Sequence, residues 1–268
     1  MLHIQNLLFF FISILFVFTT YSKIVLSPKD IKTIGQKIWH NECAGTIEGL
    51  TYWKTGEDWA SVGIGHFIWF PKKKTDRFIE GFPPLIEFMK KKKVTIPTWL
   101  LTKNSTLIDC PWNSQKEFLA DFSSTRMQNL RIFLEETIPL QTAFIVGRLD
   151  QWTKTNLPKE YSLKTKRHIK TQFNRMTKTP QGLYALIDYI NFKGEGLASG
   201  EQYHGNKWGL AQVLAAMKGE QKEKSALHDF STAAKQVLTE RVNNAPPERQ
   251  EERWLPGWKN RIDTYTKN

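Results

Sequence analysis

Most of the chain places apolar residues at the spacing of an amphipathic helix, whereas residues 49–70 have the composition of β-strands. Ser27-Pro28 precedes a stripe of isoleucines, and Glu42 comes four residues after the last of them, Ile38. A serine followed by a proline is typical of a helix start, and a stripe at steps of three and four residues is buried on one helical face. The pattern predicts a first helix at whose end Glu42 emerges from the buried stripe.

Residues 49–70 are rich in aromatic and β-branched residues and carry Thr55-Gly56 near their middle. Such a composition on both sides of a turn dipeptide predicts a β-hairpin. Gly63 and Gly65 add a further expectation, because closely spaced glycines favour a tight turn or a close approach of the backbone to another group.

Helical spacing returns after this segment and dominates the rest of the chain. Helices are predicted to start at prolines or at serine and threonine caps, namely Pro83, Ser114, Ser124, Pro139 and Thr179, with two more at 208–217 and 225–242. Residues 155–182 are basic and weakly patterned, which predicts a surface excursion, and the five glycines of 191–210 predict a loop. The predicted fold class is α+β and mostly α-helical, with a small β-hairpin near the N-terminus of the mature chain.

The chain has 268 residues, no internal repeat and no long linker, which favours one domain. Residues 1–22 contain no charged side chain, and their apolar run, Leu7 to Phe18, has the length of a signal-peptide core rather than of a membrane span. We therefore expect a cleaved signal peptide at 1–22 and a mature domain at 23–268, periplasmic or secreted, with no stable membrane span. The alternative is an uncleaved N-terminal anchor in the inner membrane.

The chain is basic: 38 Lys and Arg against 26 Asp and Glu give a net charge of +12. A field of that sign favours polyanions, and export makes peptidoglycan or another envelope glycan a more suitable partner than nucleic acid. The alternative is that the charge only keeps the protein soluble. Two cysteines are too few for a disulfide scaffold or a four-thiolate zinc site, and the scattered histidines indicate neither metal nor cofactor. The sequence carries no signal for an oligomeric state.

The two cysteines, Cys43 and Cys110, would meet an oxidising environment after export. A pair of cysteines in such a compartment predicts one disulfide. The alternative is a reactive thiol at Cys43 that works with His66 in a thiol hydrolase.

Three features of residues 42–66 suit general acid–base chemistry. Glu42, on a stripe otherwise made of isoleucine, is expected to be partly desolvated, and desolvation favours the protonated form that a general acid needs. Glu57, or its neighbour Asp58, follows the hairpin turn and supplies the second carboxylate that glycoside hydrolysis requires. Ser61 can hold a water between the two. The alternative for each carboxylate is an ordinary solvent-exposed role.

Polar and aromatic residues also gather in and after the glycine-rich loop, where Glu201 and His204 accompany them. Aromatic rings stack on the apolar face of a sugar, while carboxylates and amides bind its hydroxyls. The residues predicted to bind substrate are His66, Glu195, Tyr203, Trp208 and Gln212. The alternatives are a surface loop that caps a helix and, for His66, a histidine that holds its turn by a hydrogen bond.

The order of a helix ending in Glu, a β-hairpin, and a hydroxyl residue followed by V-G-I-G-H resembles the phage-type lysozymes, or endolysins. Residues 185–196 and 254–265 are similar to two later segments of that family, and W-G-L-A-Q resembles a groove-lining element of other muramidases. The N-E-C and G-I-G-H-F-I-W stretches also resemble a family of uncharacterised bacterial envelope proteins. The lysozyme resemblance implies a lysozyme-like domain with an additional helical insertion at about 71–178, and a catalytic set of Glu42, Glu57 and Ser61.

We therefore expect an exported, muramidase-like enzyme that hydrolyses β-1,4 glycosidic bonds of peptidoglycan. Glu57 and Ser61 stand where the lysozyme family has Asp and Thr, and at different intervals from Glu42. These departures leave a second hypothesis, a non-catalytic envelope protein that keeps the fold and binds glycan or polyanion. A third hypothesis is a thiol peptidase that uses Cys43. The separation of the two carboxyl groups decides between inversion and retention.

Overall fold

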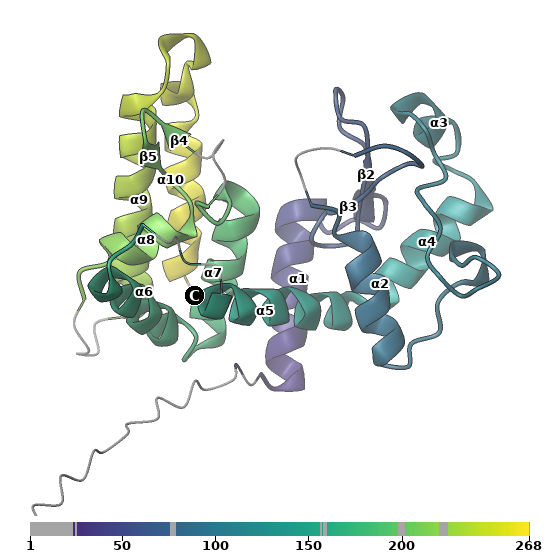
Figure 1. Cartoon of the computed structure of the whole chain (residues 1–268), viewed down its shortest axis with the longest axis horizontal. Coiled ribbons are helices and arrows are strands. Elements are labelled where there is room, and N and C mark those ends of the chain that lie inside the picture. The colour runs from purple at the N-terminus through teal and green to yellow at the C-terminus, as the bar shows by residue number, and fades with distance from the viewer. Residues whose placement is uncertain are drawn as a thin grey trace, which may run out of the picture.

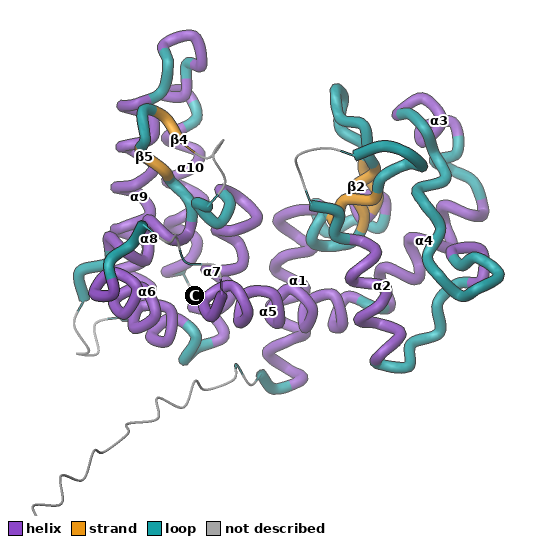
Figure 2. Tube along the Cα trace, in the orientation of Figure 1, coloured by secondary structure: helices purple, strands orange, loops and turns teal. Residues whose placement is uncertain are grey.

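The computed structural model describes residues 24, 26–75, 79–155, 157, 160–197, 202–219 and 225–267. Helices account for most of these residues, and the strands form one three-stranded sheet and one two-stranded hairpin (Figure 2). The expected mostly helical α+β class is confirmed. The predicted signal peptide at 1–22 lies outside the described residues, and none of the helices described is long and apolar enough to cross a membrane.

Helix α1, Pro28–Cys43, starts where the sequence predicts and carries Glu42 in its last turn. The Ser27 hydroxyl accepts a hydrogen bond from the Asp30 amide, and the Asp30 carboxylate accepts one from the Ser27 amide. This capping box satisfies amide groups that a helix start otherwise leaves unpaired. Two isoleucines of the stripe are buried, and the chain leaves the helix through Ala44 in the left-handed conformation, with φ 53°.

The sheet consists of β1, Thr51–Tyr52, β2, Ala60–Val62, and β3, Phe67–Trp69, in the antiparallel order β1-β2-β3. The predicted hairpin around Thr55-Gly56 joins β1 to β2 and is confirmed. A second turn at 63–66 adds β3, which the sequence did not separate from the hairpin.

Gly63 begins this second turn with φ 73°. A Cβ added there would lie 2.3 Å from Oε1 of Gln141. The same Oε1 accepts a hydrogen bond from the Ile64 amide at 2.9 Å. The predicted close approach of the backbone is therefore confirmed, and the group it approaches is a side chain of helix α5, Ile138–Thr155.

The remaining elements are mostly helices. In chain order the described ones are η1 Glu48–Leu50, α2 Phe82–Lys91, η2 Thr98–Leu100, α3 Gln115–Ala120, α4 Thr125–Glu136, α5, α6 Leu163–Met176, α7 Pro180–Lys193, β4 Gln202–Tyr203, β5 Asn206–Lys207, α8 Leu210–Ala216, α9 Ala226–Asn244, η3 Pro247–Arg249, η4 Glu251–Arg253, α10 Leu255–Asp263 and η5 Thr264–Thr266.

These elements form two groups joined by α5 and α1 (Figure 1). The sheet lies with α2, α3 and α4 in one group, and α6 to α10 with the β4-β5 hairpin form the other. Helix α5 runs along the base of both groups and packs against α1. The range 71–178, expected to be an insertion, thus supplies α2 to α6, including this central helix.

Helix α6 lies in the stretch 155–182 that we expected to be an irregular excursion, so that expectation missed a helix. Ile169, Phe173 and Met176 are buried at helical spacing, and they face α8 and α9. The stripe is narrow because lysines, arginines and polar residues occupy the other positions of the helix.

The predicted disulfide is wrong, because Cys43 and Cys110 are both free and lie at opposite ends of β3. Cys43 Sγ is 3.8 Å from Nε2 of His66, the residue before the strand. The Cys110 amide donates to the carbonyl of Phe70, the residue after the strand, at 2.9 Å. A strand of this length separates its ends by about 13 Å, whereas a disulfide needs Cα atoms within about 7 Å.

Burial raises the pKa of both thiols to about 12, and the Glu42 carboxylate adds to the effect at Cys43. Because only the thiolate reacts readily, we expect neither cysteine to react with a thiol reagent in the folded protein at mildly alkaline pH. Unfolding in denaturant should then release both thiols, as measured by a chromogenic disulfide reagent. Rapid labelling of Cys43 in the native protein would contradict this. So would an intact mass that is two hydrogens lower than that of the fully reduced chain.

Candidate functional site

Glu42 forms an ion pair with Arg261 of α10, with 2.6 Å between Oε1 and Nη2. The Glu42 side chain is only 18% exposed, which confirms the expected partial burial at the end of α1. The surroundings differ from the prediction, however. The sequence suggested a carboxylate among isoleucines, whereas the structure places a guanidinium against it.

The buried carboxylate of Asp188 on α7 holds Arg261 in place. Asp188 is 2% exposed, and Arg261 donates to both of its oxygens, at 2.9 and 2.8 Å. Tyr265 donates its hydroxyl proton at 2.5 Å, and the Asn41 amide donates at 3.1 Å. Four donors therefore satisfy a charge that would otherwise be costly to bury. Asn41, Glu42, Asp188, Arg261 and Tyr265 are called the ionic cluster below.

The Arg261 side chain stays protonated although it is largely buried. Burial opposes that charge, but the carboxylates of Asp188 and Glu42 outweigh burial and hold the pKa of Arg261 above its usual range. The pKa of Tyr265 is likewise raised, by burial and by the charge of Asp188, so its hydroxyl stays a donor. The ionic cluster thus keeps a fixed pattern of donors and acceptors around Glu42.

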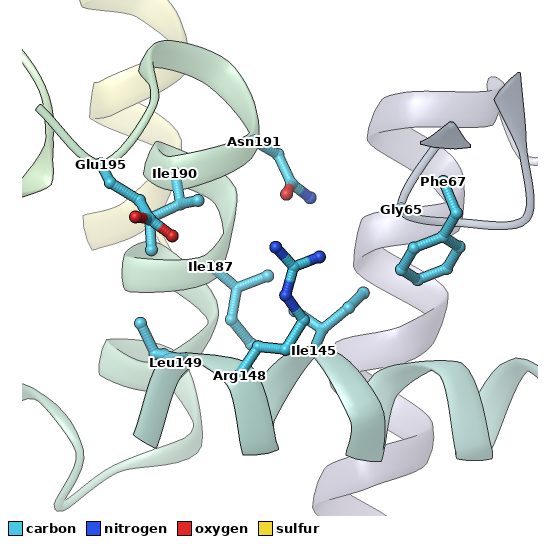
Figure 3. Close-up of a pocket in the computed structure, with 9 residues that line it drawn as sticks. All are labelled: Gly65, Phe67, Ile145, Arg148, Leu149, Ile187, Ile190, Asn191 and Glu195. Carbon is cyan, nitrogen blue, oxygen red and sulfur yellow. The ribbon is translucent and has the colours of Figure 1, made fainter. Parts of the chain in front are cut away.

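A pocket of about 140 Å³ lies between the two groups of elements (Figure 3). Its floor belongs to α5, one wall belongs to α7 and the loop after it, and the opposite wall belongs to the turn before β3. The lining residues are Gly65, Phe67, Ile145, Arg148, Leu149, Ile187, Ile190, Asn191 and Glu195. Glu195, predicted to bind substrate, is among them.

A second hollow of about 370 Å³ continues from this pocket and shares Arg148 and Glu195 with it. It extends over Phe88 of α2 and over four more residues of α5, Phe144, Gly147, Gln151 and Trp152. The two hollows together are called the α5 groove.

The ionic cluster adjoins the walls of the α5 groove. Asp188 follows Ile187 of the wall and precedes Asn191 by one helical turn, so the cluster and the wall occupy neighbouring faces of α7. On the other side Cys43, next to Glu42, contacts the turn that contains Gly65. Figure 3 shows the ribbon of α1 passing behind the pocket. Glu42 itself is not among the residues that line the groove, but its partner Arg261 binds Asp188 beside one wall, and its neighbour Cys43 contacts the turn of the other.

The structure does not bring Glu57 into the ionic cluster. Glu57 lies in the β1–β2 loop, and its carboxylate is 3.7 Å from Lys54 of the same turn. The backbone of the loop is fixed by Trp53, whose indole donates to the Glu57 carbonyl at 2.8 Å. Asp58 is 70% exposed at its side chain and pairs with Lys74 at 3.5 Å. Among the described residues, Glu42 and Glu57 share no hydrogen-bond or ion-pair partner.

Ser61 and His66 lie on the sheet side of the site. Ser61 is buried and stands in register with Tyr52, which is half exposed. The His66 ring stacks on the Tyr52 ring with 6.1 Å between centroids, and its φ of 43° fits the second turn of the sheet. This placement favours the turn-holding role of His66, while the exposed Tyr52 ring beside it offers a surface for stacking.

Tyr203, Trp208 and Gln212 are not among the residues that line the α5 groove. The Tyr203 hydroxyl donates to Glu251 at 2.7 Å, and its ring lies 4.7 Å from the ring of Trp208, which is 6% exposed. Gln212 donates to the Tyr161 hydroxyl at 2.8 Å and lines a different hollow, of about 640 Å³. Of the four loop residues predicted to bind substrate, Glu195 lines the α5 groove, and the other three do not. Glu201 falls outside the described residues.

Lys193, the last residue of α7, is a buried amine that sequence analysis did not single out. Its Nζ lies 3.2 Å from the centroid of the Trp258 ring and 4.1 Å from that of Phe192. Its pKa is lowered to about 6, mainly by burial and also by the charges of Arg241 and Arg261, while Glu251 opposes them. The amine is therefore largely neutral at neutral pH.

Asp188, Arg148 and Asn191 were also missed by sequence analysis. Asp188 did leave a signal, because it is the single charged residue in the apolar run of α7. Arg148 and Asn191 left none, since each looks like an ordinary polar position on a helix. No cluster of histidine, cysteine or carboxylate side chains in the described ranges could hold a metal ion.

Comparisons of the chain with protein-family models, curated proteins and solved structures found no match.

Replacing Arg261 should be strongly destabilising, because it leaves Asp188 buried without its cation. We expect Arg261→Met to lower the free energy of unfolding by about 3 kcal/mol or more in urea denaturation. Asp188→Leu added to Arg261→Met should recover part of that loss. The exposed control Arg167→Met should change stability by less than about 0.5 kcal/mol. Equal stabilities of the Arg261 and Arg167 variants would contradict the buried ion pair.

Lys193 should make stability depend on pH above neutrality. Its pKa is about 6 in the folded protein against 10.5 for a free side chain, so between those values the unfolded chain binds the extra proton. The contribution of Lys193 to the free energy of unfolding should therefore rise with pH inside that window. Lys193→Met should flatten the rise and increase stability at neutral pH by at least about 1 kcal/mol. Parallel pH curves for wild type and variant would refute a buried neutral amine.

Proposed function

We propose that the protein is a glycoside hydrolase that cleaves β-1,4 bonds of peptidoglycan, with Glu42 as the proton donor. The observation that supports this most is the placement of Glu42. It is a mostly buried carboxylate at the end of α1, held by Arg261, and it lies beside the α5 groove without being one of its lining residues. A glycan strand is long and needs such an open, two-walled site.

In this proposal the Glu42 carboxyl group takes up a proton when substrate binds, and it transfers that proton to the oxygen of the glycosidic bond as the bond breaks. The sugar carbon gains positive charge, and a water molecule adds to it and gives up its own proton to a second carboxylate. Arg261 contributes after the transfer, because it pairs with the carboxylate that Glu42 has become. Asp188 positions Arg261 for that role through its two hydrogen bonds.

The second carboxylate in the proposal is Glu57, and Ser61 holds the water. Both lie on the β1–β2 hairpin, whose half-exposed Tyr52 stacks with His66 of the next turn, 63–66. Glu57 has only one partner for its carboxylate among the described residues, the lysine of its own turn, and that exposed pair is weak. The carboxylate is therefore available to a substrate-bound water.

The sequence resemblance to phage-type lysozymes supports the same reaction, as do the predicted export and the charge of +12. The pairing of Glu57 within its own turn favours the second candidate, a glycan-binding protein without turnover. A thiol peptidase is the poorest fit, because a Cys43 thiol with a pKa of about 12 holds almost no nucleophilic thiolate at neutral pH.

Glu42→Gln should abolish hydrolysis while the protein stays folded. We expect the release of muropeptides from purified peptidoglycan to fall by at least about a hundredfold, because general acid catalysis contributes that much or more. Glu136→Gln, which removes an exposed carboxylate from the end of α4, is the matched control and should keep the wild-type rate. Release would be followed by chromatography of the soluble fragments.

Retention of the wild-type rate in Glu42→Gln would remove Glu42 from the reaction. If wild type releases nothing, but wild type and Glu42→Gln sediment equally with peptidoglycan, the glycan-binding candidate replaces the hydrolase.

A further inference from the structure

Arg148 places a positive charge in the α5 groove. The residue lies in the middle of α5, and Figure 3 shows its guanidinium projecting upward from the floor, between Asn191 and Phe67. It lines both hollows of the groove. The centroid of the Phe144 ring lies 5.9 Å from its guanidinium carbon. Among the described residues it has no hydrogen-bond or ion-pair partner.

The surroundings of Arg148 strengthen its attraction for an anion. Ile145 and Leu149 flank it on the floor, and Ile187 and Ile190 form the nearby wall. A charge above an apolar surface in a concave site is less screened than one on an open surface. The amide of Asn191 on the same wall can add a hydrogen bond to a bound anion.

The charge balance of the groove favours a ligand with one carboxylate over a polyanion. Arg148 is the only lysine or arginine among the described residues that line the groove, and Glu195 lines it as well. Glu195 is itself engaged in an interaction within the protein. A planar guanidinium pairs with one carboxylate through two parallel hydrogen bonds, whereas a phosphate chain needs several cations.

The second hollow provides room beside that charge. Gly147 lies on its floor, and a Cβ added there would have no atom within 4 Å, so the space above it is open. Phe88 and Phe144, with ring centroids 5.5 Å apart, form an apolar surface next to this space. Small apolar side chains such as those of alanine fit such a surface.

We propose that the α5 groove binds the peptide stem of the glycan, with Arg148 pairing with a stem carboxylate. The proposal rests on peptidoglycan being the substrate, because the sugars themselves carry no free carboxylate once the stem is attached. The acidic residues of the stem supply the anion, and its alanines lie against the phenylalanine surface. The groove therefore selects stem-bearing strands, and Glu42 acts on the sugar bond beside it.

The direct test is binding of N-acetylmuramyl-L-Ala-D-Glu and of its diester, followed by NMR titration of isotope-labelled protein. Wild type should bind the free acid at least about tenfold more tightly than the diester, because the ester cannot form the charged pair. Arg148→Gln should bind both alike, and Arg148→Lys should fall between. Arg167→Gln, an exposed arginine of α6, is the matched control and should behave as wild type.

A steric variant tests the same site without changing its charge. Gly147→Leu fills the open space above the α5 floor and, within a helix, should not destabilise the fold. It should weaken binding of the free acid by about tenfold, while Gly147→Ala, with a smaller side chain, should have little effect. Equal binding by Gly147→Leu and wild type would overturn the placement of the stem.

The results separate this proposal from the proposed hydrolysis. Preference for the free acid that depends on Arg148, without any muropeptide release, supports the stem site and overturns the enzyme. Release at equal rates from stem-bearing and stem-stripped glycan, unchanged by Arg148→Gln, supports the enzyme and overturns the stem site. A wild type that binds acid and diester equally also overturns it.

Discussion

The hydrogen-bonded ion pair between Asp188 and Arg261 is the interaction on which the rest of the site depends. A carboxylate that is 2% exposed must be compensated where it lies, and its donors come from α1, α10 and the final turn of the chain. These partners are 147, 73 and 77 residues away in the sequence. The cost of leaving the charge unpaired therefore fixes how three distant elements meet. Glu42 gains its position from that arrangement rather than from its own helix.

The same arrangement explains the neutral lysine at the end of α7. Arg261 lies 4.6 Å from the Phe192 ring, Lys193 lies between the rings of Phe192 and Trp258, and Arg241 is 4.9 Å from Trp258. Both arginines have carboxylate partners close by, whereas the lysine is left among aromatic rings between two cations. An arginine does not release its proton in a protein, whereas a lysine can. Lys193 is therefore the one of these three cationic residues that becomes neutral.

Local features of the structure could be predicted from the sequence, and long-range ones could not. The helix starts at Ser27, Ser114, Ser124 and Thr179 each depend on one hydroxyl and on an amide three residues later. A short stretch of sequence therefore contains everything needed to predict them. Glu42 was found for the same reason, since a helix end is local. Its partner Arg261 is 219 residues away, and only the resemblance of the terminal segment drew attention to that part of the chain.

The disulfide prediction failed for a related reason. Redox compartment and cysteine count say nothing about where two residues lie on a strand, and β3 separates Cys43 from Cys110 by its whole length. The residues of the predicted sugar-binding loop likewise do not lie together in one site. Tyr203 donates a hydrogen bond to Glu251, and the Trp208 ring contacts Arg241. Glu195, close to the end of α7, lines the groove.

Two arginines with opposite surroundings define how this site can work. Arg261 pairs with two carboxylates through its Nε and Nη2 atoms, so it holds the side chains of Glu42 and Asp188 in place. Arg148 has no such partner among the described residues, so it can accept a ligand but orients no side chain of the cluster. Neighbouring faces of α7 keep the two apart, since Asp188 faces the cluster and Asn191 faces the groove. In the proposed enzyme, stem binding and proton transfer could therefore change independently, because no hydrogen bond links the two arginines through a shared side chain in the described structure.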